Sequence, residues 1–536
     1  MNPIRRTSRL VRCCSAPYRA ARETIVGEYV MRVSGWLTGT VLAAGLAAAT
    51  PAAAQKSADT LRITWRDALP DITPYYNQLR TGIVISHQAW DGLVYRDPET
   101  FQIKPLLASS FKWVDDTTLE FVMRPNATFH NGDPVTADDV VYTLNSILTD
   151  KLVSVPSNYS FIDRAEKVDD KTVRVKLKRI FPAALEYMAM TMPILPKAYR
   201  EKVGVSEYSK HPIGAGPYKI TKVDGVTQID FERYDGYYAD SPKGKPAIRK
   251  LVIHEVPDSA TEMAELLGGR ADWIWKFSPD QFDAVARMPT LQAARSESMR
   301  IGYINMDSAG RTGADNPLTK LKVRQAIFHA IDRATMAKQL VQGGSRPLDT
   351  PCYPTQFGCD AASAVHYDYD PAQAKKLLAE AGYPNGFDTE LVTYVLPQWA
   401  GAMQGYLKAV GINAKLTLLQ VSAQVQRSGE GKNPLDAGDW GSYSINDVSA
   451  ILPQYFNFGP ADYTRDPEVQ KLVQEGGATV DPDKRRKAYS AAIKRITENA
   501  YWLPMYTYAI TYGFSKQLEF KPYPDELPRF YLSKWK

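Results

Sequence analysis

The first 54 residues constrain the fold most, because they have the pattern of a leader that is removed before the protein folds. On this interpretation only the residues from about 55 onward form the folded protein. Seven arginines and no lysine accompany an uncharged stretch over residues 33–55, whose apolar part is too short and too rich in small residues to span a bilayer. Ala52 and Ala54 form the small-x-small pattern that a signal peptidase cuts. We therefore expect a secretory signal peptide that is cleaved after Ala54, and a mature chain in the periplasm. An N-terminal membrane anchor is the alternative.

The translation start is a second question at this end of the chain. Met31 and Arg32 alone would give a signal peptide a compact start, so we hypothesise that residues 1–30 are an over-extended reading frame. The pair Arg5-Arg6 lies far from the apolar run and is a weak twin-arginine signal.

The net charge of +6 lies almost entirely in the leader. Seven arginines and two glutamates leave +5 in residues 1–54, so residues 55–536 carry about +1. A nearly neutral mature chain does not support a nucleic-acid-binding surface. Its length is too great for one hydrophobic core, so we expect at least two lobes with a ligand cleft between them.

Cysteine usage agrees with export. Cys13 and Cys14 fall in the leader, and the mature chain keeps only Cys352 and Cys359. In an oxidising compartment this pair predicts a local disulfide, and two free buried thiols are the alternative. A zinc pair is not supported, because no other Cys or His has ligand spacing. We expect no metal and no other cofactor.

The mature chain contains strand-like patterns. Apolar and polar residues alternate over residues 60–66, 118–123 and 172–177, which predicts strands in antiparallel hairpins. Amphipathic helices are predicted over residues 137–148 and 323–340. The mixture is α/β in character, without the strict βαβ rhythm of a Rossmann sheet.

The sequence carries no recognisable catalytic constellation. A Gly-x-Ser-x-Gly elbow, a His-Glu-x-x-His pair and a Walker loop are all missing from the sequence. The six histidines are scattered without metal-ligand spacing. We therefore expect a protein that is not an enzyme, with a secreted hydrolase as the alternative.

Several blocks of sequence occur in an order that is similar to one known family. They lie at residues 103–118, 129–140, 212–218, 233–238, 317–333 and 369–387. In these blocks the chain resembles the bacterial extracellular solute-binding protein family 5, the dipeptide- and oligopeptide-binding proteins that serve ABC importers. Most of the blocks have a structural explanation as strand ends, turns and helix caps, so they indicate the scaffold and not the ligand contacts.

The resemblance implies an α/β fold: a two-lobed periplasmic-binding-protein clamshell, type II-like and of the large peptide-binding class, with mixed sheets and a two-strand hinge. Lobe one would comprise residues 55–300, with residues 507–536 returning to it. Lobe two would comprise residues 307–500. The hinge crossings would lie near residues 301–306 and 501–508.

The resemblance also implies a function. The protein would capture a small solute, a di- or oligopeptide in the first place, and deliver it to an inner-membrane ABC permease. We expect a monomer with no nucleic-acid partner. The alternatives are a non-peptide solute such as an oligosaccharide, an opine or a metal chelate, or a sensor domain on the same scaffold.

Peptide binders of this family carry a carboxylate three residues after a tryptophan, where it meets the α-ammonium of the ligand. Here Trp440 fits the tryptophan position, but Tyr443 occupies the carboxylate position. Asp439 or Asp447 could substitute for the missing carboxylate. The predicted ligand-binding residues are Asp439, Trp440, Gly441, Ser442, Tyr443 and Asp447, with the cleft-facing aromatic segments contributing Tyr76, Asn77 and Trp399.

Overall fold

A computed structural model describes residues 59–67, 71–225 and 227–536 of the chain. The predicted signal peptide, its cleavage site and the alternative start at Met31 lie outside these residues. Within the described ranges, no helix is long and apolar enough to cross a membrane.

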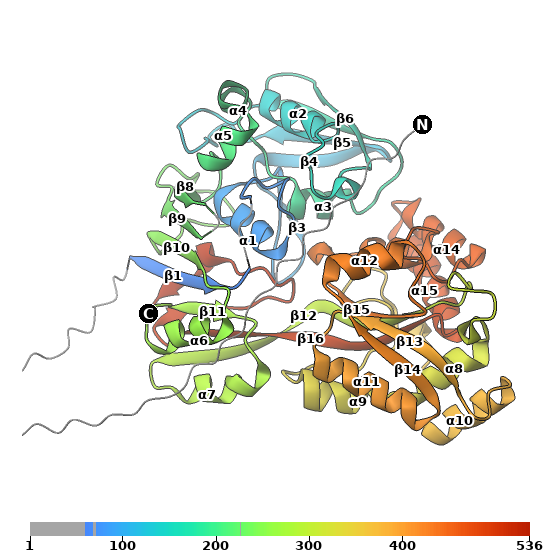
Figure 1. Ribbon diagram of the computed structural model, residues 1–536. Coiled ribbons are helices and arrows are strands. Elements are labelled where there is room, and N and C mark those ends of the chain that lie inside the picture. The colour runs from blue at the N-terminus through green and yellow to red at the C-terminus, as the bar shows by residue number, and fades with distance from the viewer. Residues whose placement is uncertain (1–58, 68–70, 226) are drawn as a thin grey trace, which may run out of the picture. The chain divides into compact units, whose positions relative to one another are not determined.

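A mixed sheet of ten strands runs through the described chain (Figure 1). Its strands are β1 (Thr60–Trp65), β8 (Tyr218–Asp224), β9 (Gln228–Arg233), β10 (Lys250–Glu255), β11 (Trp273–Trp275), β12 (Leu291–Met306), β13 (Phe387–Thr393), β14 (Ile412–Leu418), β15 (Leu435–Trp440) and β16 (Trp502–Ser515). Their spatial order is β14-β13-β15-β12-β16-β11-β1-β10-β9-β8. The strand predicted over residues 60–66 is β1, but the hairpin prediction is wrong for it, because β1 is parallel to both β10 and β11. Alternation reports which face of a strand is buried and not the direction of its neighbours.

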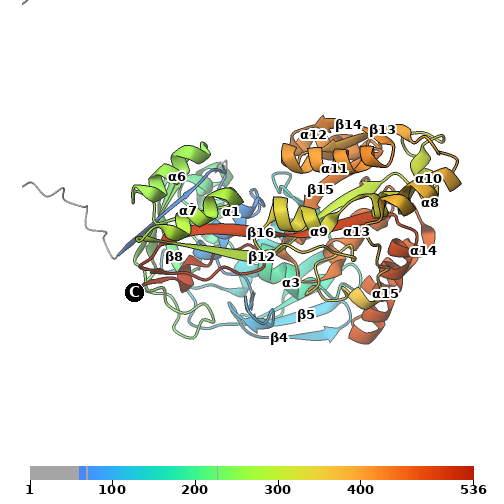
Figure 2. The same ribbon diagram turned by 90° about the horizontal axis from the view of Figure 1, so that it is seen from below.

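Two long strands join the halves of this sheet. β12 and β16 pair with each other in antiparallel orientation, and the end of β12 also pairs with β15. The ladder between β12 and β16 shifts register between Ser298 and Tyr303. Figure 2 shows β12 and β16 running from the elements around α6 and α7 to the elements around α9 and α13. Residues 301–306 of the first predicted crossing lie within β12, and residues 502–508 of the second lie within β16.

Apolar side chains form separate cores along the sheet. The largest contains Leu61 and Trp273, a second contains Ile304 and Leu503, and a third contains Tyr303 with the C-terminal helices. Two main cores connected by two strands are the architecture of a two-lobed clamshell, because each lobe must bury its own apolar surface.

A second sheet is antiparallel and is formed by strands from the first part of the chain. Its strands are β4 (Ala108–Asp115), β5 (Thr118–Met123), β6 (Ile162–Lys167) and β7 (Thr172–Leu177), in the order β4-β5-β7-β6. Strands β5 and β7 confirm the predictions over residues 118–123 and 172–177, hairpins included.

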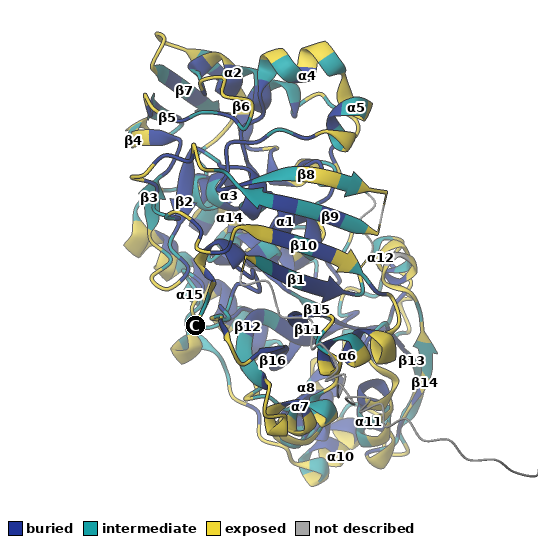
Figure 3. Cartoon of the chain, turned by 90° about the vertical axis from the view of Figure 1, so that its left-hand side faces the viewer, coloured by how far each residue is buried: buried dark blue, intermediate teal, exposed yellow. Residues whose placement is uncertain are grey.

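Helices cover both sheets. The first half of the chain contributes α1 (Arg80–Ala89), α2 (Ala137–Ser146), α3 (Ala184–Thr191), α4 (Lys197–Val203), α5 (Val205–Lys210), α6 (Ser259–Leu267) and α7 (Phe282–Arg287). The second half contributes α8 (Leu321–Ala330), α9 (Arg333–Met336), α10 (Pro371–Glu380), α11 (Pro397–Ala409), α12 (Val421–Gly429), α13 (Leu452–Phe456), α14 (Pro467–Gly477) and α15 (Pro482–Glu498). The remaining described strands are short: β2 (Val94–Arg96), β3 (Ile103–Pro105), β17 (Leu518–Glu519) and β18 (Lys534–Trp535). Figure 3 shows β1 buried inside the sheet and exposed residues on the outer turns of α4, α7 and α10.

The predicted helix over residues 323–340 is interrupted. α8 ends at Ala330, Ile331 has an extended backbone with φ −106° and ψ 117°, and α9 restarts at Arg333. Asp332 caps the new helix by accepting a hydrogen bond from the Thr335 N–H at 2.8 Å. Asp is a weak residue inside a helix and a strong one at its start, which explains the break.

Two of the family blocks meet at the end of α1. His130 accepts a hydrogen bond from the Gly214 N–H at Nδ1 (3.2 Å), and its Nε2 lies 3.0 Å from the Gly216 carbonyl oxygen. A Cβ at Gly214 would lie 2.0 Å from the Ala89 carbonyl oxygen, so only glycine allows this approach. These blocks are therefore scaffold, as the sequence indicates.

Candidate ligand-binding site

The turn that follows β15 has an unusual backbone. Ser442, Tyr443 and Ser444 have φ of 48°, 50° and 64°, a left-handed conformation that costs roughly 1–2 kcal/mol per non-glycine residue. Neighbouring groups hold it in place. The Ser444 hydroxyl donates to the Asp525 carbonyl oxygen at 2.6 Å, and the Arg96 guanidinium donates to the Ser444 carbonyl oxygen. These contacts anchor the turn from which the Tyr443 side chain projects.

Tyr443 lines two cavities. The larger has a volume of about 370 Å³ and the smaller about 180 Å³. Segments far apart in the sequence form both of them. The larger is lined by Ser157, Asn158, Ser160, Phe161, Arg179, Phe181, Pro182 and Tyr187 on one side, and by Tyr443, Ser449, Ala450, Pro453, Gln454, Asn457, Val473, Gln474, Gly477, Ala478 and Tyr489 on the other. The smaller is lined by Gln78, Leu79, Arg80 and Ile83, with Arg300, Trp440, Gly441, Ser442 and Tyr443.

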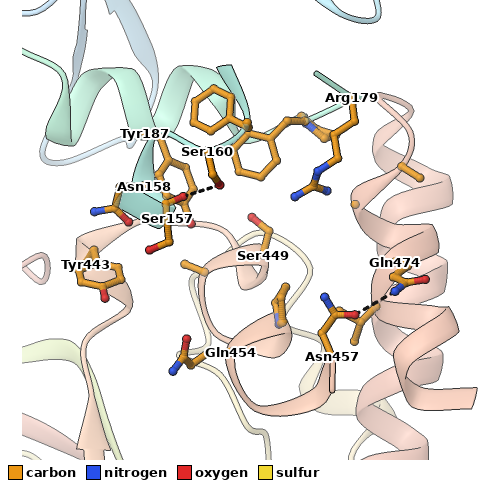
Figure 4. Close-up of a pocket in the computed structure, with 18 of the residues that line it drawn as sticks. Ser157, Asn158, Ser160, Arg179, Tyr187, Tyr443, Ser449, Gln454, Asn457 and Gln474 are labelled. Atoms are coloured by element: carbon orange, nitrogen blue, oxygen red, sulfur yellow. Dashed lines mark hydrogen bonds between the residues drawn. The ribbon is translucent and has the colours of Figure 1, made fainter. Parts of the chain in front are cut away.

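The larger cavity has an aromatic wall and a polar wall (Figure 4). The rings of Phe161 and Phe181 are stacked with centroids 4.3 Å apart, and Tyr187 meets Phe161 edge-on at 5.9 Å. Opposite them, Gln474 donates to the Asn457 side-chain oxygen at 3.0 Å. Such a cavity offers both apolar area and directional hydrogen bonds, as small-molecule sites do.

The smaller cavity lies against a charge cluster. Glu526 pairs with Arg300 at 3.2 Å and with Arg80 at 3.3 Å, and Arg300 also pairs with Asp439. Burial would raise the pKa of Glu526, but Arg300, Arg80 and Lys276 outweigh burial and lower that pKa to about 2. Glu526 is therefore ionised at neutral pH, and charges of both signs stand at one end of the cleft.

Four predicted residues lie together at this junction. Trp440 is half-buried and meets Tyr443 edge-on, with ring centroids 5.1 Å apart. A Cβ at Gly441 would lie 3.1 Å from the Arg300 guanidinium, so glycine keeps this approach open. Ser442 is buried within the turn. Burial raises the pKa of Tyr443, so its hydroxyl stays neutral and cannot supply the charge of a carboxylate.

The two aspartates that could replace the missing carboxylate already have partners. Asp447 accepts two hydrogen bonds from Arg485, at 2.9 and 2.8 Å, and both side chains are buried. Asp439 pairs with Arg300. A ligand ammonium would have to share Asp439 with Arg300, or Asp447 with Arg485.

The predicted residues from other segments lie further from the turn. The Tyr76 hydroxyl donates to Asp150 at 2.6 Å, and the Asn77 amide donates to the Asp71 carbonyl oxygen at 2.8 Å. The residues that follow them, 78–80, line the smaller cavity instead. Trp399 lines a separate cavity of about 330 Å³ beside β16. Their role in ligand binding stays a prediction.

The structure pairs Cys352 with Cys359 in a disulfide, as the sequence predicts. The loop that it closes supports the back of the binding turn. Gln356 donates to the Ile445 carbonyl oxygen at 2.9 Å, and the Phe357 N–H donates to the Asn446 carbonyl oxygen at 3.0 Å. The disulfide loop and the Tyr443 turn therefore form one packed unit.

Sequence reasoning missed the arginines of the cleft. Arg80, Arg179 and Arg300 come from three segments and carry no local motif. Only the folded chain brings them to the two cavities. Among the described residues, no group of His, Cys, Asp and Glu side chains has the arrangement of a metal site.

A family model for the bacterial extracellular solute-binding proteins, family 5, matches residues 102–462. The chain belongs to this family. Family 5 proteins bind solutes outside the cytoplasm, so the recognition of the fold and of the general function from the sequence blocks is confirmed.

Curated family 5 relatives cover nearly the same length. The chain is 26% identical to the glutathione-binding protein GsiB of Pectobacterium atrosepticum over 517 residues, which cover 91% of this chain and 97% of that protein. It is 27% identical to GsiB of Escherichia coli over 505 residues, covering 89% and 94% of the two chains.

Solved structures agree on the fold. A dipeptide-binding protein from Pseudoalteromonas sp. SM9913 in complex with Met-Leu has a TM-score of 0.75 at 23% identity, covering 89% of this chain and 100% of the other. The protein AgaA from A. tumefaciens R10, in complex with agropinic acid, has a TM-score of 0.72 at 25% identity, covering 89% and 99%. The predicted clamshell is thereby confirmed.

Proposed function

We propose that this family 5 protein captures short peptides in the cleft around Tyr443 and delivers them to an ABC import permease. The observation that carries the proposal is the left-handed turn after β15, which places Tyr443 in the wall of both cavities. Peptides carry apolar, hydrogen-bonding and charged groups in a short span, and the two cavities offer partners for all three. Relatives with the names of glutathione- and dipeptide-binding proteins support the same ligand class.

We further propose that the lobes divide as the sequence resemblance implies. Lobe one would comprise residues 55–300 with 507–536, and lobe two residues 307–500. The crossings would be the segments 301–306 and 501–508. Two observations support this division: β12 and β16 connect the halves of the sheet, and separate cores lie along it. Rotation about these two strands would close the cleft on the solute.

The amino group of a bound peptide needs a partner other than residue 443. Glu526 is ionised and lies with Asp439 beside the smaller cavity. We propose that the peptide's ammonium group faces this acidic pair, although Arg80 and Arg300 already neutralise part of its charge. A weaker ammonium site is the expected result, because a shared carboxylate gives a smaller net interaction.

An opine is the second candidate ligand. The neutral Tyr443 at the carboxylate position and the likeness to AgaA favour a solute without a free α-ammonium group. The two candidates differ in one property that can be measured, which is the need for a free amino group.

The first experiment is native mass spectrometry of the protein purified gently from periplasm, followed by denaturation to release the bound solute. Short peptides in the released fraction would support the proposal, and an opine would replace it with the second candidate. An empty protein would then be tested by thermal shift with reduced glutathione, Met-Leu and agropinic acid. A ligand at a hundredfold excess over its Kd adds roughly 2.7 kcal/mol to the unfolding free energy. If no peptide is released and none shifts the melting temperature, the peptide proposal fails.

The same preparation tests three further proposals. We propose that the mature chain starts at Gln55 in the periplasm, that it is a monomer, and that it leaves its ligand chemically intact. N-terminal sequencing, native mass and recovery of unhydrolysed peptide after incubation are the corresponding readouts. Recovery of cleaved peptide would favour the hydrolase alternative.

A further inference from the structure

The larger cavity carries a single formal charge. Among its described lining residues only Arg179 is charged, and no described carboxylate pairs with it. Its guanidinium carbon lies 5.6 Å from the centroid of the Phe181 ring. Arg80, Arg300 and Arg485 differ from it, because each has a carboxylate partner. The charge of Arg179 is therefore available to a ligand.

The wall opposite Arg179 is neutral and polar. Figure 4 shows the guanidinium directed toward the space above Ser449 and Asn457. The Asn457 side-chain oxygen accepts from Gln474, which leaves its amide N–H groups to donate elsewhere. The Ser449 hydroxyl is buried and has no hydrogen-bond partner among the described residues. Donors thus face the cavity from both walls, while acceptors with a negative charge are missing from its described lining.

The aromatic wall strengthens this preference. Phe161, Phe181 and Tyr187 pack against each other, and the guanidinium of Arg179 lies over the Phe181 ring. Arg179 itself is exposed, so a solute that enters the cavity can reach its charge and displace water from it. An unpaired cation in this position favours an anionic group on the solute.

We propose that the larger cavity binds a carboxylate group of the captured solute through Arg179, so that the protein selects peptides with an acidic side chain or with a free C-terminus placed there. This inference rests on the proposed function, because it names the class of peptide. An ammonium group is disfavoured in the same cavity, since it would face Arg179 without a carboxylate.

The test uses a tripeptide library made in matched forms. Each Glu or Asp member has a Gln or Asn counterpart, and each free acid has a C-terminal amide. The chain from Gln55 onward is incubated with the mixture, and captured members are quantified by mass spectrometry. The same measurement is made for Arg179→Gln, for Arg179→Lys and for Lys178→Gln, a control that removes one positive charge next to the cavity residue.

The wild-type protein is expected to enrich one carboxylate-bearing class over its matched amide. Arg179→Gln should reduce that enrichment about 10- to 100-fold, the loss of one charge-assisted hydrogen bond. Arg179→Lys should retain part of it, and Lys178→Gln should leave it unchanged. The side-chain pairs and the C-terminal pairs report separately which carboxylate is bound. Unchanged melting temperatures would show that all variants are folded.

Three results would overturn the inference. Equal capture of acids and amides by the wild-type protein would reject it while leaving the peptide proposal intact. An equal loss of enrichment in Arg179→Gln and Lys178→Gln would show that Arg179 acts only through the overall positive charge near the cavity. Capture of no library member by the wild-type protein would reject the proposed function itself, and the inference with it.

Discussion

At the scale of single residues, Tyr443 is the main departure of this chain from the binding pattern that the sequence resemblance implies. It takes the position at which the sequence resemblance implies a carboxylate, and its neutral hydroxyl cannot replace that charge. Its left-handed backbone conformation is one that Asp and Asn tolerate better than tyrosine does. A substitution to Asp is therefore compatible with the turn.

We predict that Tyr443→Asp strengthens the binding of Met-Leu about 10- to 100-fold relative to N-acetyl-Met-Leu, because a carboxylate would meet the free ammonium. Isothermal titration calorimetry of both ligands measures the ratio. Tyr443→Asn is the matched control, since it removes the ring without adding charge. The same ratio in both variants would show that position 443 does not face the amino terminus.

His130 makes the stability depend on pH. Burial lowers its pKa from 6.5 to about 4, so the unfolded chain binds a proton in this window and the folded chain does not. Stability should therefore fall by about 3 kcal/mol as the pH drops from about 6.5 to 4. Urea unfolding of the wild-type protein and of His130→Gln across this range isolates the effect. Parallel curves for the two proteins would assign the pH dependence to other groups.

At the scale of elements, the disulfide loop and the binding turn act together. Gln356 and Phe357 bond to the backbone of residues 445 and 446, directly after the turn. A closed loop with a sequence separation of 7 contributes about 2 to 3 kcal/mol in the chain-entropy model. The loop thus stabilises the protein and fixes the turn.

We predict that replacing both Cys352 and Cys359 by Ser lowers the unfolding free energy by about 2 to 3 kcal/mol and weakens ligand binding. Hydrogen exchange should become faster over residues 445–448 before it changes in β13 or β14. Faster exchange spread evenly over all these elements would show that the disulfide loop does not specifically stabilise the binding turn.

Replacing either of two glycines by alanine is expected to change the stability of the protein in opposite directions. Gly214→Ala should destabilise the protein by more than 1 kcal/mol, because its Cβ would lie 2.0 Å from the Ala89 carbonyl oxygen. Gly405→Ala should stabilise it by about 0.5 to 1 kcal/mol, because this residue lies within α11 and a Cβ there meets no atom within 4 Å. Thermal unfolding measures both. Equal effects would contradict the role of Gly214 in the approach to α1.

At the scale of the whole molecule, the chain threads through the sheet so that its C-terminal segment closes the first core. Asp525 pairs with Arg96 at 2.8 Å, and Phe530 meets Trp273 edge-on at 5.0 Å. We predict that truncation after Ser515 reduces hydrogen-exchange protection in β1 and β10 and leaves β13 and β14 protected. An equal loss in both halves would contradict the separation of the two cores.

The sequence by itself determined the α/β class, the disulfide pair, the strands β5 and β7 and membership of the family, because these depend on local periodicity, turn residues and block order. Tertiary structure alone decided the parallel neighbours of β1 and the pairing of Asp447 with Arg485. It also decided which arginines reach the cleft. Nothing in the sequence distinguishes Arg179 from the other arginines of the mature chain. Only the folded chain brings it to a cavity that segments far apart in the sequence form and whose described lining contains no carboxylate.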